Sequence, residues 1–165
     1  MKKLLFLILG VMFVSLASFA KDKEEGYVPE YQMEGAGMTS SNAQQVKVTI
    51  LSKKKDVSDA DLSKCAVHGV LFRDYDDVTN SGYGSVASHK CLMGSPTKEV
   101  EHIDFFEPFF RNGDWSRYVQ LVSDSRRVVK SGKQWKTSAI VRVNSSALKE
   151  DLQKQGLVKS LKSGW

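Results

Sequence analysis

Hydrophobic and polar residues alternate most regularly in residues 46–51, which predicts a strand with one buried face. Residues 135–144 show the same alternation, and the turn residues at 131–132 join them to an extended segment, 118–130. Residues 31–38 are short and interrupted by glycine, so they predict a weaker strand. The chain therefore predicts two antiparallel strand pairs, one near each end.

Helical spacing predicts a helix that begins at Ser58, a good N-cap residue, and stops at Gly69. The apolar run 70–72 is short, and it predicts a buried strand. A second helix is expected after Thr97, where apolar residues recur every three or four positions, and Pro108 should kink it or end it early.

A final helix is predicted for residues 145–156, which gives the order ββαβαββα. Strands and helices do not alternate regularly, so the predicted class is α+β. We expect a mainly antiparallel sheet of four to five strands with about three helices on one face. Residues 75–97 show no periodicity and predict a long loop, which is often functional.

The first twenty residues have a basic head, an apolar centre and small residues before position 21, as in a secretory signal peptide. We therefore divide the chain into a Sec signal peptide (1–20), a flexible leader (21–30) and a single α+β domain (31–165). The cleavage region holds no lipobox cysteine, and no second long apolar stretch follows. These features predict a secreted or periplasmic protein with no membrane span after signal removal.

Charge is distributed unevenly along the chain, whose formal net charge is +5. Residues 126–165 hold ten basic and two acidic side chains, while residues 21–125 hold 12 basic and 17 acidic ones. We expect a basic C-terminal hairpin and helix surface for an anionic partner. The alternative is a set of edge-strand lysines that discourage aggregation. The candidate contact residues are Arg126, Arg127, Lys130, Lys133, Lys136 and Arg142.

Two runs carry a resemblance to known proteins: Ala66-Val67-His68-Gly69-Val70-Leu71-Phe72-Arg73, and the segment from Ala139 to Leu148 followed by Leu152. Together they resemble a family of small secreted proteins of unknown function from Bacteroidetes. The strand pair and helix of the second half are also similar to LPP20-like envelope accessory domains. The first resemblance implies export without implying an activity, and the second implies a binding or assembly role.

The chain has two cysteines, Cys65 and Cys91, and in an oxidising compartment an even pair predicts a disulfide. Two free thiols remain an alternative. A third possibility is a metal site, because Cys65 and His68 lie three residues apart and His89 and Cys91 lie two apart, and thiolate and imidazole suit zinc. The i, i+3 pair of Glu99 and His102 is interpreted as part of a solvated helix face.

No nucleophile signature, zinc-protease motif or phosphate-binding glycine loop is present, so we expect no catalysis and no cofactor. The predicted function is a non-catalytic binding or assembly module of the bacterial envelope. Its partner would be an envelope protein or an anionic surface glycan, and not a nucleic acid. The alternative is a small secreted metal-binding protein or Cys/His enzyme centred on Cys65, His68, His89 and Cys91.

Overall fold

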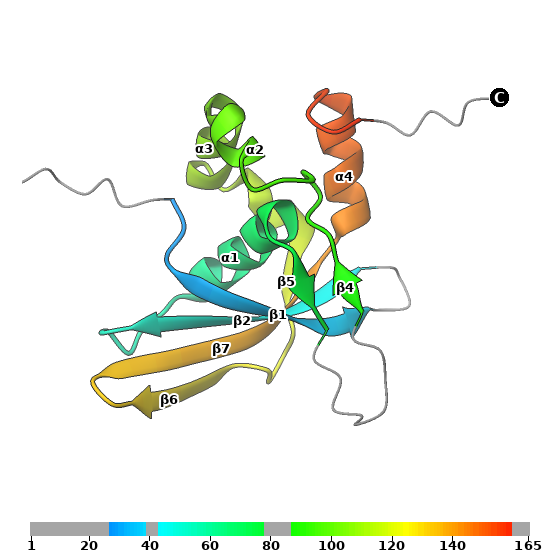
Figure 1. Cartoon of the computed structure of the whole chain (residues 1–165). Coiled ribbons are helices and arrows are strands. Elements are labelled where there is room, and N and C mark those ends of the chain that lie inside the picture. Colours follow the sequence, from blue (N-terminus) through cyan, green and yellow to red (C-terminus); the bar gives the residue numbers. More distant parts are fainter. Residues whose placement is uncertain (1–26, 39–42, 78–86, 160–165) are drawn as a thin grey trace, which may run out of the picture.

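The computed structural model describes residues 27–38, 43–77 and 87–159, and these form an α+β fold (Figure 1). A five-stranded antiparallel sheet has the order β1-β2-β7-β5, and β6 also pairs with β7. The helices lie on one face of this sheet, so the predicted fold class is confirmed. The predicted signal peptide, residues 1–20, lies outside the described residues.

The first strand pair forms as the alternation predicts. Strand β1 (Tyr31–Met38) runs antiparallel to β2 (Gln44–Ser52), with Tyr31 opposite Ile50. Every second side chain of β2 is directed to the helices, and the residues between them lie on the open face. The pattern of buried residues thus follows the period of the strand except at Thr49, which is also buried.

Strand β7 (Gln134–Val143) is central, since it pairs with all of β2 on one side. Its other side is shared by β5 (Val119–Leu121) and β6 (Arg127–Ser131). The predicted single extended segment, 118–130, is therefore two strands. Between them Asp124 has a φ of 57°, a left-handed conformation that interrupts the strand.

Helix α1 (Asp59–Phe72) begins as predicted, because the Ser58 hydroxyl accepts a hydrogen bond from the Asp61 amide. The prediction of a stop at Gly69 followed by a strand is wrong, and the helix continues to Phe72. Gly69 lies close to β1, because a Cβ at this position would lie 2.3 Å from the sulfur of Met33, so a larger residue would displace that side chain. The glycine therefore allows β1 to approach the helix.

The second predicted helix is divided into α2 (Lys98–Glu101) and α3 (Ile103–Arg111). Pro108 does not end α3, which continues for three further residues because Phe109 and Phe110 are buried in the core. A 3₁₀ helix, η1 (Asp114–Tyr118), then leads into β5.

Helix α4 (Ser145–Lys154) follows β7 and is capped by the side chain of Asn144, which accepts a hydrogen bond from the Ala147 amide. In the region predicted as a loop, β3 (Tyr75–Asp76) and β4 (Ser88–His89) form a two-stranded sheet. No helix in the part of the chain that the structure describes is long and apolar enough to cross a membrane.

The close approach at Gly69 gives a test of the packing. Gly69→Val should lower the free energy of unfolding by about 1–3 kcal/mol, because the added atoms meet Met33. Adding Met33→Ala should recover part of this loss, since it removes the atoms that clash. Urea unfolding of the two single variants and the double variant measures the coupling. Strictly additive effects would contradict the assigned contact.

Candidate functional site

Two turns project from the same end of the main sheet. Ser52, the last residue of β2, lies opposite Trp135 at the start of β7, and Trp135 also lies opposite Lys130 on β6. The segment after β2 and the turn between β6 and β7 are therefore neighbours. We call the six lysines gathered here the lysine-rich end: Lys53, Lys54, Lys55, Lys130, Lys133 and Lys136.

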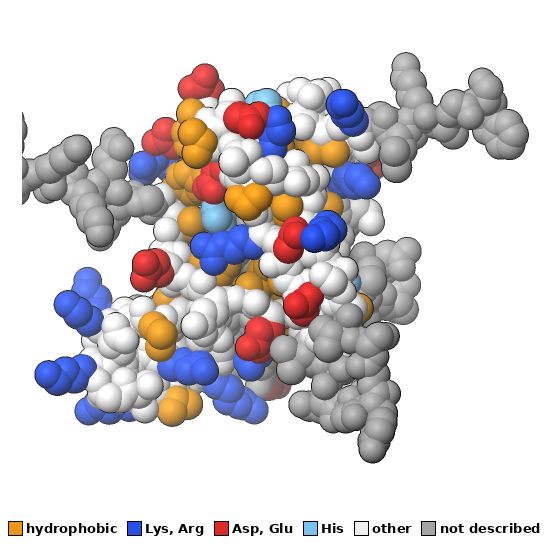
Figure 2. All heavy atoms as spheres, in the orientation of Figure 1, with side chains coloured by type: hydrophobic (Ala, Val, Ile, Leu, Met, Phe, Trp, Pro, Cys, Tyr) orange, Lys and Arg blue, Asp and Glu red, His pale blue; other side chains and the backbone are white. Residues whose placement is uncertain are grey.

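None of these six lysines forms an ion pair among the described residues, and all six are exposed. Two of them lie against the same aromatic ring: Lys55 Nζ is 5.4 Å and Lys130 Nζ is 6.0 Å from the ring centroid of Trp135. This arrangement brings cations from both turns together. In Figure 2 the Lys and Arg side chains gather over this end, and acidic side chains are more frequent over the helices.

The six basic residues predicted as the contact surface separate in the structure. Lys130, Lys133 and Lys136 belong to the lysine-rich end, and Arg127 lies on the same hairpin. Arg126 instead forms an ion pair with Asp59 and donates a hydrogen bond of 2.7 Å to the Val57 carbonyl.

Arg142 lies near the opposite end of β7 and donates a hydrogen bond to Gln120. The three lysines at positions 53–55 were not among the predicted contact residues. Their signal was a run of three consecutive lysines directly after a strand, but only the strand register places that run beside the hairpin.

A largely buried polar network lies away from the lysine-rich end, around the side chain of His68 on α1. His68 Nδ1 is 2.6 Å from the hydroxyl of Tyr31, and His68 Nε2 is 2.9 Å from Glu99 Oε1. Glu99 also accepts a hydrogen bond from the hydroxyl of Tyr27. The network thus joins the N-terminal segment, α1 and α2, and the interpretation of Glu99 as part of a solvated helix face is wrong.

The electrostatics of this network favour an ionised Glu99. Burial alone would raise the pKa of Glu99, but hydrogen bonds with His68 and Tyr27 outweigh burial and hold the pKa below its ordinary value. Burial raises the pKa of Tyr27 and of Tyr31, so both hydroxyls stay protonated. Each polar group of this network has a hydrogen-bond partner, as expected for a network that stabilises the fold.

The predicted disulfide is wrong, because Cys65 and Cys91 are separate, buried thiols. Cys65 lies in the middle of α1, with its sulfur 4.0 Å from the Pro29 carbonyl oxygen. The Cys91 amide instead donates to Asp74, beyond the end of α1.

The structure does not bring the four candidate metal ligands together. His68 is held by Tyr31 and Glu99, while His89 Nε2 is 3.1 Å from Asp77 and its ring stacks on Tyr75. Among the residues at 27–38, 43–77 and 87–159, no group of three or more His, Cys, Asp or Glu side chains has a geometry that would hold a metal ion.

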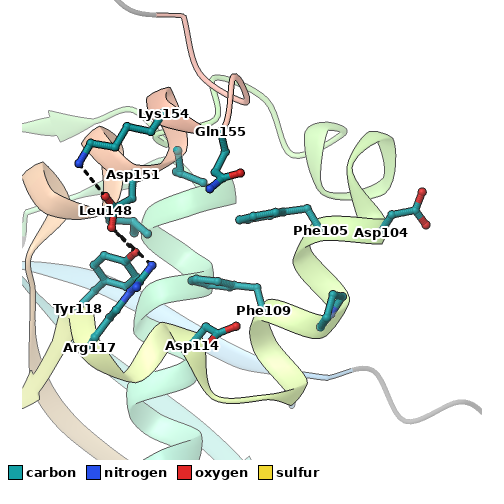
Figure 3. A pocket seen from close by; sticks show the side chains of 12 residues that line it. Asp104, Phe105, Phe109, Asp114, Arg117, Tyr118, Leu148, Asp151, Lys154 and Gln155 are labelled. Carbon is teal, nitrogen blue, oxygen red and sulfur yellow. Dashed lines mark hydrogen bonds and ion pairs between the residues drawn. The ribbon is translucent and has the colours of Figure 1, made fainter.

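A groove of about 550 Å³ separates α3 from α4 (Figure 3). Phe105 and Phe109 point into it from α3 and face Leu148 of α4. On one side Asp151 accepts a hydrogen bond of 2.8 Å from Tyr118 and forms ion pairs with Lys154 and Arg117. The charges on that rim therefore neutralise one another and present no strong field to a ligand.

Comparisons with known proteins give no identification. No protein-family model matches the chain, and no curated protein and no solved structure is significantly similar to it. The function must therefore be inferred from the geometry described above.

The thiols provide one test of this structure. Burial raises the pKa of Cys65 to about 12 and also raises the pKa of Cys91, so neither thiol should ionise near neutral pH. We expect slow reaction with an aromatic disulfide reagent in the native protein, and two reactive thiols per chain in concentrated guanidinium chloride. If no thiol reacts after denaturation, the disulfide prediction is restored.

Glu99 provides a second test, through the pH dependence of stability. Its pKa is lower in the folded state, so its carboxylate stabilises the fold above the unfolded pKa of about 4.3, and this contribution disappears as the pH falls through the folded value. Glu99→Gln should cost on the order of 1 kcal/mol at pH 7. The difference from wild type, measured by urea unfolding, should shrink at pH 3.

The matched control is Glu107→Gln, which removes an exposed carboxylate paired with Arg111. Exposed ion pairs contribute little, so this variant should differ from wild type by less than about 0.5 kcal/mol at pH 7. A loss at Glu99 that does not change with pH would contradict the role of its charge.

Proposed function

We propose that the protein is a non-catalytic binding module of the bacterial envelope, secreted or periplasmic, that contacts an anionic partner through its lysine-rich end. The observation that carries this proposal is the concentration of six exposed lysines, without ion pairs among the described residues, on two neighbouring turns and on the ends of β6 and β7 beside them. Such a concentration of one sign raises the local potential and attracts anions from a distance. The pattern of residues 1–20, which is typical of a signal peptide, supports export, and the charge asymmetry of the chain supports an electrostatic contact.

Two features weigh against the alternative of a Cys/His enzyme. A nucleophilic cysteine requires a lowered pKa, whereas burial raises the pKa of Cys65. Neither ring nitrogen of His68 is free to act as a base, since one meets Tyr31 and the other meets Glu99. The proposal therefore assigns this histidine a structural role.

Charge reversal tests the proposal. Lys53→Glu, Lys133→Glu and Lys136→Glu, combined in one chain, change the charge of the lysine-rich end by six units. On a column of immobilised dextran sulfate, the wild type should elute at moderate salt, because ions screen such contacts over about 10 Å at 0.1 M. The triple variant should pass through the column unretained.

The matched control reverses three other lysines that form no ion pair in the described part of the chain, Lys64, Lys149 and Lys159. It has the same net charge, so equal loss of retention would show that total charge alone matters, and this would refute the assigned surface. Melting curves of both variants confirm that each remains folded.

A further inference from the structure

The open face of the sheet has an apolar component beside the lysine-rich end. In the strand register, Lys136 on β7 lies between Leu51 on β2 and Val129 on β6. Directly opposed residues point to the same face of a sheet, so these three side chains form one row across three strands. Leu51 is 44% exposed and Val129 is 58% exposed, although both are aliphatic.

No helix covers this face among the described residues (Figure 1). The strand register places the row beside the two lysine-bearing turns. The half-exposed ring of Trp135 lies on the opposite side of the same hairpin, between Lys55 and Lys130. One end of the molecule therefore presents two aliphatic side chains and an aromatic ring, all within a border of cations. Amphipathic aromatic residues with nearby lysines are typical of the boundary between water and lipid.

The shape of this end favours an extended anionic surface over a discrete ligand. None of the six lysines lines the hollow beside it, which is bordered by Leu51, Gln134 and the oppositely charged Glu30 and Arg73, among others. Lysine presents a mobile point charge, whereas the planar fork of arginine is suited to defined bidentate contacts. A soluble glycan offers little apolar surface to Leu51 and Val129, whereas the acyl boundary of a bilayer offers a continuous one.

We propose that the lysine-rich end docks the protein on a lipid bilayer rich in anionic headgroups, with Leu51 and Val129 reaching the interfacial region. This proposal rests on the proposed function and names the partner. Lysines near an anionic membrane surface each contribute to attraction, which decays within the Debye length. The aliphatic pair then supplies a contact that salt does not screen.

The test measures sedimentation of the purified full chain with vesicles. Wild type should bind vesicles of phosphatidylglycerol, should bind vesicles of phosphatidylcholine at least tenfold less tightly, and should lose affinity as salt rises. The combined variant Lys53→Glu, Lys133→Glu and Lys136→Glu should lose binding to the anionic vesicles. Equal binding to both vesicle types would overturn the inference.

A second variant separates lipid from other polyanions. Leu51→Ser combined with Val129→Ser should weaken binding to anionic vesicles by roughly tenfold, since two apolar contacts are lost, and should leave retention on dextran sulfate unchanged. The control is Val100→Ser with Ile103→Ser, which removes the other two exposed large hydrophobic residues in the described ranges. These two residues lie on α2 and α3, so vesicle binding should not change.

The outcomes distinguish this inference from the proposed function. Retention on dextran sulfate without binding to anionic vesicles would overturn the lipid assignment and leave the anionic contact in place, with a glycan or an acidic protein as the partner. Failure to bind either material would overturn both. Unaltered vesicle binding by the Leu51 and Val129 variant would also overturn the inference, because the lysines alone would then explain the attraction.

Discussion

The burial of α1 on all sides is the constraint on which the rest of the structure depends. Eight consecutive residues, Cys65–Phe72, are buried, so this half of the helix has no face that can meet water. The sheet covers it through β2 and β7, and β1 covers it at Gly69. Aromatic residues of α3 cover it at Phe72, whose ring meets Phe106 edge-on with centroids 4.8 Å apart. Burying one polar residue in this stretch, His68, then requires partners for both of its ring nitrogens.

This constraint also explains why the other face of the sheet is open. Most of the large apolar side chains among the described residues belong to the core around α1, and the helices lie with it on one face (Figure 1). The opposite face carries mainly polar side chains, so it is stable in water without a covering layer. Strand register then determines what that face presents, which is Lys136 between Leu51 and Val129. The two turns beside this row carry four further lysines, and Lys130 lies at the end of β6.

Local sequence patterns predict the helices and strands better than they predict the tertiary contacts around each element. The two strand pairs and the cap of α1 follow from period-two alternation and from Ser58, which are local signals. Val70 to Phe72 were assigned to a strand because a short apolar run has no period of its own, and burial on every side removes the amphipathic pattern of a helix. Glu99 was placed in solvent, since nothing in the sequence reveals that Tyr27 and His68 lie beside it. Lys53 and Lys133 are 80 residues apart in sequence, so only the register of β2 against β7 unites them.

The usual reason for surface lysines on a sheet does not account for the lysine-rich end. Lysines protect edge strands from pairing with other chains, and Lys130 on β6 fits that role. Lys136 is on β7, which has partners on both sides, while Lys53 and Lys133 lie outside strands, where there is no edge to protect. Among the described lysines outside this end, four form ion pairs with carboxylates, as in Lys90 with Asp74, and three others form none but do not lie together. Six neighbouring cations without such pairs repel one another in the free protein, and an anionic surface would relieve that repulsion on contact.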